Sequence, residues 1–179
     1  MSSKVAHKND LINLLYGSIV KQTLEVHKDN IDECNRQLDE IGFGIGLRLI
    51  DEFLIKTESE SCKSFKDVIE KVIVAFRLFL GVEARYVQRS DTDFSVTFFD
   101  NPFDDNVFLP NDLRTLRYSN VLCGLVRGGL EALNYRAKCF FVLDKFSQNR
   151  ENTGLVLPNY EIAVELVEII KKKLINYDE

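Results

Sequence analysis

The chain has 179 residues, of which 45% are hydrophobic and 28% are charged, and its formal net charge is −5. This length and composition are typical of a single globular domain with a substantial hydrophobic core. The negative charge argues against a general nucleic-acid-binding protein, which usually presents a basic surface. With two histidines and no C-x-x-C pair, the chain offers little material for a metal site, a Ser-His-Asp triad or a disulfide framework.

The first third of the chain is predicted to be helical. Residues 1–9 are polar and are expected to form a flexible N-terminus. Asp10 is a candidate cap for a helix over 11–27, where apolar residues recur with the helical period. A second helix is predicted from Ile31 to about Lys56, because glycines in its middle interrupt the propensity without stopping the apolar pattern.

A polar loop and a third helix follow. The loop covers 57–63 and contains Cys62, the one cysteine outside an apolar pattern. Ser64 is expected to cap the helix, with Asp67 in the first turn, where the helix dipole favours a negative charge. Apolar residues at helical spacing continue to Gly81, which is expected to end the helix.

The second half is rich in β-branched and aromatic residues. Strands are predicted over 82–89, 93–99, 137–146 and 161–170. The first two are expected to form a hairpin around Ser90, Asp91 and Thr92. Residues 171–179 are expected to form a flexible C-terminal tail.

Between the strands, Tyr118 to Leu133 is predicted to be a central helix capped by Thr115 or Ser119. Its polar residues fall on one stripe, so the rest of its surface is expected to be buried. The stripe consists of Arg117, Asn120, Arg127, Glu131 and Asn134.

Two pairs of glycines indicate how the helices meet. Gly124 and Gly128 lie four apart on the central helix, and Gly42 and Gly46 repeat this spacing on the second helix. Each glycine lowers helix stability by roughly 1 kcal/mol relative to alanine, which is explained if another element packs very close. The spacing therefore predicts a tight crossing of the two helices at the centre of the domain.

These elements predict an α+β fold in two layers, with four to five α-helices packed on one face of a small antiparallel β-sheet of about four strands. The expected organisation is a single domain over 10–170, between the flexible ends at 1–9 and 171–179.

Two candidate binding sites are better explained by structural roles than by ligand binding. Gly42-Phe43-Gly44-Ile45-Gly46 lacks the spacing of a dinucleotide-binding loop, and a helix rather than a strand precedes it. Arg114, Arg117 and Arg127 are candidates for a basic patch that meets phosphate or anionic lipid, although ordinary helix solubility fits each alone better.

Cys62 is the strongest candidate among the cysteines for a chemical role. A thiol in a polar loop beside Lys63, near a helix N-terminus, has its thiolate stabilised by positive charge. This makes Cys62 a candidate nucleophile or acylation site, although an inert surface cysteine fits the sequence chemistry alone better. Cys34, Cys123 and Cys139 are expected to be small core residues.

Three blocks in the same order carry a resemblance to a known family: 16–20, 42–54 and 118–128. The sequence resembles the small core subunits of TRAPP, the transport protein particle, and within them the Bet branch. The resemblance implies helices packed on a small antiparallel sheet, and a homodimer or a heterodimer with other small TRAPP subunits through the helical side. It implies no catalysis by the chain alone.

In the assembly, the resemblance implies vesicle tethering in ER-to-Golgi transport and guanine-nucleotide exchange on a Rab GTPase. The implied localisation is cytoplasmic and peripheral at Golgi and ER-to-Golgi membranes, which agrees with the lack of a signal peptide or a membrane-length apolar run. No nucleic-acid partner is expected. The residues implied to contact the GTPase are Asn176, Tyr177, Asp178 and Glu179.

The resemblance also assigns a lipid site. Cys62 matches the acylated cysteine of the family, so covalent palmitate is implied there, with no other cofactor and no metal. The acyl chain is expected in an apolar tunnel lined by Val72, Ala75, Phe76 and Phe79, with Ala75 keeping the tunnel open. Burial stabilises the protein by about 0.8 kcal/mol per methylene, so the chain would act as core.

Two alternatives remain for the same residues. One is a lipid-carrying domain whose tunnel holds a free fatty acid. The other is a thiol acyl-transfer enzyme with Cys62 as its nucleophile, although no general base is visible near it in the sequence.

Overall fold

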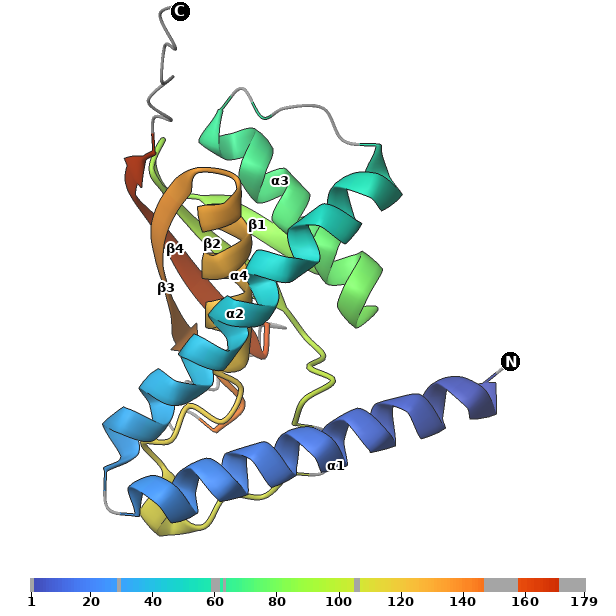
Figure 1. The fold of residues 1–179 in the computed structure, drawn as a ribbon, viewed down its shortest axis with the longest axis vertical. Coiled ribbons are helices and arrows are strands. Elements are labelled where there is room, and N and C mark those ends of the chain that lie inside the picture. Colours follow the sequence, from blue (N-terminus) through green and yellow to red (C-terminus); the bar gives the residue numbers. More distant parts are fainter. Residues whose placement is uncertain are drawn as a thin grey trace, which may run out of the picture.

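The chain folds into a layer of helices on one face of a four-stranded antiparallel sheet, which confirms the predicted α+β class (Figure 1). The computed structural model describes residues 2–28, 30–58, 62, 64–104, 107–146 and 158–170, with side chains from residue 11. The α-helices are α1 (Ser2–His27), α2 (Ile31–Thr57), α3 (Phe65–Ala75) and α4 (Val121–Ala132). A π-helical turn, η1 (Phe76–Leu80), continues α3, and a 3-10 turn, η2 (Asn111–Leu113), precedes α4.

The sheet contains the predicted strands in the order β1-β2-β4-β3. Their bounds are β1 (Ala84–Gln88), β2 (Asp93–Phe98), β3 (Tyr135–Leu143) and β4 (Tyr160–Ile169). The β1–β2 hairpin turns where predicted, and the Ser90 hydroxyl accepts hydrogen bonds from the backbone of Thr92 and Asp93. Every second residue of β2 faces the helices and is buried, which matches the period of a half-buried strand.

The predicted crossing of α2 and α4 is confirmed at the centre of the helical layer. A Cβ atom on Gly42 would lie 2.1 Å from the Val121 carbonyl oxygen, and one on Gly46 would lie 2.3 Å from that of Leu125. The approach is reciprocal, because a Cβ on Gly124 would lie 1.9 Å from the carbonyl oxygen of Asp39. Only glycine permits backbones to come this close.

A polar stripe on a helix by itself predicts a solvated face, but the stripe of α4 is only partly exposed. Asn120 donates to the Asn35 carbonyl oxygen of α2 at 2.7 Å, and Arg127 donates to Asp39 at 2.6 Å. These two residues pair with polar groups that α2 carries along the crossing. Arg127 also lies 3.3 Å from Glu40.

The three candidate arginines do not form a free basic patch. Arg117 pairs with Asp144 at 2.6 Å, Arg127 pairs with Asp39, and Arg114 donates to the Asn111 side chain. Their guanidinium groups are occupied by partners within the domain.

The start of the first helix differs from the prediction. Helix α1 begins at Ser2 rather than Leu11, because lysine and alanine before Asp10 sustain a helix without an apolar stripe. The predicted flexible N-terminus at 1–9 is therefore helical from Ser2. The predicted tail at 171–179 lies outside the described residues.

The predicted caps of α4 are also wrong. Asn120 occupies the N-cap position without a side-chain capping bond, and Ser119 instead accepts a hydrogen bond from Asn101 at 2.8 Å. That bond belongs to a buried network in which Tyr160 donates to the Asp104 carboxylate at 2.8 Å. Buried polar groups need partners, and the network takes the Ser119 hydroxyl away from the helix end.

The glycine crossing predicts opposite effects for two alanine substitutions on α2. Gly42→Ala should destabilise the protein by about 1–3 kcal/mol or more, because the new methyl group meets backbone. Gly44→Ala, where a Cβ meets nothing within 4 Å, should stabilise it by about 0.5–1 kcal/mol. Urea unfolding measures both, and equal effects at the two positions would contradict the crossing.

Candidate functional site

An apolar pocket lies between α2, α3, η1 and α4. Its cavity volume is about 110 Å³. Helix α2 contributes Leu49 and Phe53, and α4 contributes Leu122 and Leu130. Lys71 is the one charged residue among the described lining residues. Such a surface suits a ligand with a long hydrocarbon part and offers little to a polar substrate.

The third wall of the pocket comes from the segment that the sequence singled out. Val72, Ala75, Phe76 and Phe79 all line it, from the last turns of α3 and from η1. The change from α-helix to π-helix after Ala75 was not predicted. A π-helical turn shifts the following side chains relative to an α-helix, and such turns are frequent at functional sites.

Sequence reasoning missed the walls from α2 and α4, because their apolar faces were assigned to the core. Gly129 of α4 gave a usable signal. Its backbone N would lie 2.9 Å from a Cβ on Gly46, but a Cβ on Gly129 itself would meet nothing within 4 Å, and Gly129 lines the pocket. The missing side chain therefore leaves open space instead of permitting a close contact.

Cys62 lies at the start of the helix that forms the pocket wall. Ser64 caps α3 as predicted, accepting from the Asp67 backbone at 3.2 Å while the Asp67 carboxylate accepts from the Ser64 backbone. This capping box fixes the entry of the chain into α3. Cys62 is a free, partly buried thiol that packs against the core. Nearby Tyr135 has its pKa raised by burial and, next, by the Cys62 and Asp67 charges.

Cys62 and the pocket are connected along the chain by α3. Cys62 does not line the pocket within the described residues, whereas Val68, one turn into the helix, does. A group attached to the Cys62 sulfur would reach the pocket by running beside α3. Lys63 and the candidate GTPase contacts at 176–179 lie outside the described residues.

The other cysteines have the character of core residues, as expected. Cys34 and Cys123 are fully buried, and Cys139 packs partly buried against the core. Burial raises the pKa of Cys123 and of Cys139. Both are therefore poor nucleophiles at neutral pH.

The described residues offer few other kinds of site. They contain no group of three or more His, Cys, Asp or Glu side chains placed to hold a metal ion. No helix within the same ranges is long and apolar enough to cross a bilayer.

A protein-family comparison decides the assignment. The family model described as transport protein particle (TRAPP) component matches residues 12–157. The chain belongs to the TRAPP component family. The predicted resemblance to TRAPP subunits is thus confirmed.

Individual TRAPP proteins agree with this assignment. Trafficking protein particle complex subunit 3 of Dictyostelium discoideum is 36% identical, over 95% of this chain and 89% of that protein. Transport protein particle subunit bet3 of Schizosaccharomyces pombe is 39% identical, over 95% of this chain and 90% of that protein. These relatives are named as subunits of a trafficking complex.

A solved TRAPP structure is similar in fold. Trafficking protein particle complex subunit 3 from Naegleria fowleri, covalently bound to palmitic acid, has a TM-score of 0.83 and 35% identity. The match covers 93% of this chain and 99% of that one. The fold described above is therefore that of a TRAPP subunit.

The environments of the four cysteines predict selective alkylation. After hydroxylamine treatment to free any thioester, iodoacetamide should modify Cys62 first, because Cys123 and Cys139 have raised pKa values and Cys34 is buried. Peptide mass spectrometry over time measures the order. Cys62→Ser should remove the fast phase, and fast labelling of Cys139 would contradict the prediction.

Proposed function

We propose that this protein is a core subunit of a TRAPP vesicle-tethering complex in ER-to-Golgi transport, with a palmitoyl chain on Cys62 buried in the pocket. Membership of the TRAPP family supports the role in the complex. The position of the pocket, beside the helix whose N-cap Ser64 lies two residues after Cys62, is the observation that carries the lipid assignment. Covalent palmitate in the Naegleria fowleri structure supports the same chemistry.

The chain contributes to Rab guanine-nucleotide exchange within the assembly and is not an enzyme by itself. The proposed GTPase contact is Asn176–Glu179, at the C-terminal end of the sequence. The protein acts in the cytoplasm, at the surface of Golgi and ER-to-Golgi membranes. The names of the relatives, which describe subunits of a trafficking complex, support this proposal.

The pocket as it stands must widen to hold the whole chain. Its volume of about 110 Å³ is below the roughly 150 Å³ of a cavity that accommodates benzene. The wall formed by α3 and η1 can move outward most easily, because the glycine contacts hold α2 and α4 together. Phe79 contacts α2 through tilted ring packing with Phe53, at 6.4 Å between centroids, and through a cation–π contact with Lys56.

Dimerisation through the helical side is supported by α1. Tyr16 and Val20 are buried and dock the helix onto the domain. Leu11, Leu14 and Leu15 are exposed by 68%, 71% and 63%, and their spacing places them on one face. Figure 1 shows α1 along one end of the domain, extending past the other helices. An apolar stripe of this kind marks a protein interface.

The lipid assignment predicts a thioester-linked acyl chain. The intact mass of the purified protein should carry a palmitoyl increment that neutral hydroxylamine removes and that Cys62→Ala lacks. A fatty acid that organic solvent extracts without hydroxylamine would instead support the lipid-carrying alternative. Steady release of acyl product by the isolated chain would support the acyl-transfer alternative.

Filling the pocket should exclude the chain without harming the fold. Gly129→Leu should abolish the palmitoyl increment, because its side chain enters the open space beside Gly129. Gly44→Leu is the matched control, since that glycine also has an open environment but does not line the pocket. Full acylation of Gly129→Leu, with folding verified by circular dichroism, would place the acyl chain elsewhere.

The exposed face of α1 predicts a charge-sensitive dimer. Leu14→Lys should convert a dimer to a monomer in sedimentation velocity, because it buries an unpaired charge in the interface. Val87→Lys, a similarly exposed site on β1, should leave the dimer intact. A Leu14→Lys variant that stays dimeric would exclude α1 as the interface.

A further inference from the structure

The β3 strand has an edge to which the domain supplies no strand. The sheet order is β1-β2-β4-β3, so β3 pairs with β4 on one side only within the described residues. A groove of about 670 Å³ separates this edge from α2 and α4. Five consecutive residues of β3, from Arg136 to Phe140, line the groove, so the strand borders it lengthwise.

The direction of the backbone groups along β3 follows from the ladder. The Leu166 N–H donates to the Thr92 carbonyl oxygen, so the backbone groups of Leu166 point toward β2. Because this direction alternates along a strand, the backbone groups of Glu165, Ala163 and Glu161 point toward β3. Lys138 lies opposite Glu165 and Phe140 lies opposite Ala163, so the backbone groups of Lys138 and Phe140 hydrogen-bond to β4. Ala137 and Cys139 therefore direct their N–H and C=O groups away from β4, toward the groove.

A contact at Phe141 supports this alternation. Burial raises the pKa of the Cys123 thiol of α4, and the backbone of Phe141, two residues beyond Cys139, acts in the opposite direction, which places it beside that thiol. Helix α4 therefore covers the strand edge at Phe141. The outward groups of Ala137 and Cys139 have no hydrogen-bond partner in the part of the chain that is described.

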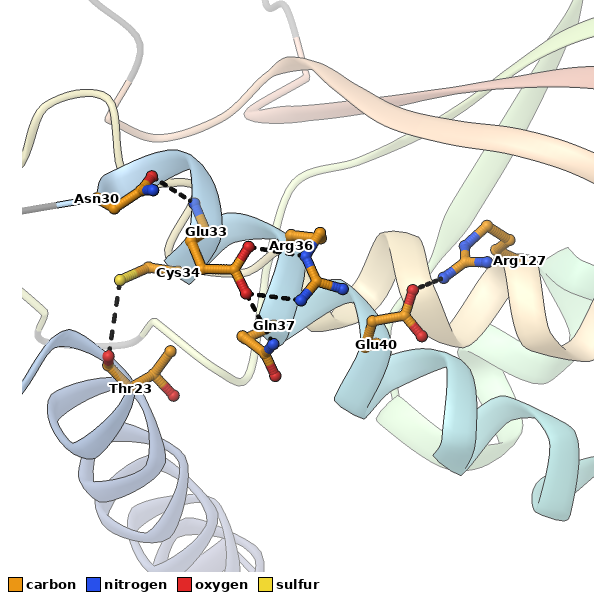
Figure 2. A network of polar contacts seen from close by, with 8 residues as sticks. All are labelled: Thr23, Asn30, Glu33, Cys34, Arg36, Gln37, Glu40 and Arg127. Atoms are coloured by element: carbon orange, nitrogen blue, oxygen red, sulfur yellow. Dashed lines mark hydrogen bonds and ion pairs between the residues drawn. The ribbon is translucent and has the colours of Figure 1, made fainter. Parts of the chain in front are cut away.

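On the wall of the groove opposite β3, ion pairs hold the charged side chains in place, and their charges nearly cancel. Figure 2 shows the polar side of α2, where Arg36 pairs with Glu33 and Arg127 reaches across from α4 to Glu40. The Arg127 guanidinium also lies 4.2 Å above the ring of Phe43. These charges satisfy one another, so the wall attracts no simple ion. Paired backbone donors and acceptors at a strand edge are complemented best by another extended polypeptide.

We propose that the edge of β3 binds an extended segment of a partner TRAPP subunit as an additional strand, through backbone hydrogen bonds to Ala137 and Cys139. This inference rests on the proposed function, because that function identifies the assembly in which the partner subunit is sought.

Side chains beside the edge indicate the chemistry of the segment. Lys138 is exposed and forms no ion pair within the described residues, although Glu165 lies opposite on β4. Phe140 is 44% exposed, two residues further along the same face. The partner strand should therefore present an acidic residue beside Lys138 and an apolar residue beside Phe140, with one residue between them.

A second copy of this chain fits the edge poorly. Antiparallel self-pairing through Ala137 and Cys139 would be centred on Lys138 and would place two lysines directly opposite. Like charges in that position destabilise a strand pair. A different subunit with an acidic residue avoids this repulsion.

Hydrogen exchange tests the proposal on the full chain, alone and co-assembled with the other small TRAPP subunits. The amides of Ala137 and Cys139 should exchange at least about tenfold more slowly in the assembly than in the free chain. An assembly that forms without this slowing overturns the inference and leaves the proposed function intact. Failure of the wild-type chain to assemble counts against both.

Two variants separate edge pairing from general protection. Cys139→Pro blocks the outward N–H but removes no bond to β4, since proline is tolerated on an edge strand. Lys138→Glu reverses the charge beside the edge, and Lys66→Glu makes the same change on exposed α3 as a control. Both edge variants should lose the added protection, and the control should keep it. Unchanged protection in Cys139→Pro, or protection that rises with the concentration of the chain alone, overturns the proposal.

Discussion

The close approach of α2 and α4 is the constraint on which the rest of the domain depends. Four glycines, Gly42 and Gly46 facing Gly124 and Gly128, bring the backbones so near that a single methyl group meets carbonyl oxygens at about 2 Å. Helices more commonly pack 8–10 Å apart through side chains. With side chains removed from the contact, the residues on either side of the crossing must complete the interface. The helical layer is consequently rigid here and adjustable elsewhere.

The two sides of the crossing have different chemistry. One side carries the pairs that join Asn35 to Asn120 and Asp39 to Arg127, which fix the register of α2 on α4. The other side opens into the apolar pocket, closed by α3 and η1. The proposed acyl chain would act as part of the hydrophobic core there, because the lining residues are almost all apolar. A lipid in this position would stabilise the subunit without anchoring it in a membrane.

The sequence predicted the elements whose signals are local. The Ser64–Asp67 cap, the turn after Ser90 and the glycine crossing all followed from a few adjacent or evenly spaced residues. It failed where a distant residue decides the outcome. Ser119 accepts from Asn101 and does not cap α4, and Asn120 and Arg127 of the α4 stripe pair with α2, because these partners lie far along the chain. The pocket was half predicted for the same reason: its α3 residues followed from the resemblance to TRAPP subunits, whereas the α2 and α4 walls require the packed structure.

The proposed acyl chain begins at the Cys62 sulfur and completes the core between α2, α3 and α4. The proposed lipid pocket, the exposed face of α1 and the edge of β3 lie in separate parts of the domain, so each can be tested without disturbing the others. The most direct test is a crystal structure of the protein purified from its own cells without detergent. The account predicts continuous electron density from Cys62 Sγ along α3 into a widened pocket. A free Cys62 thiol with Phe79 and Phe53 closed over an empty pocket would contradict it.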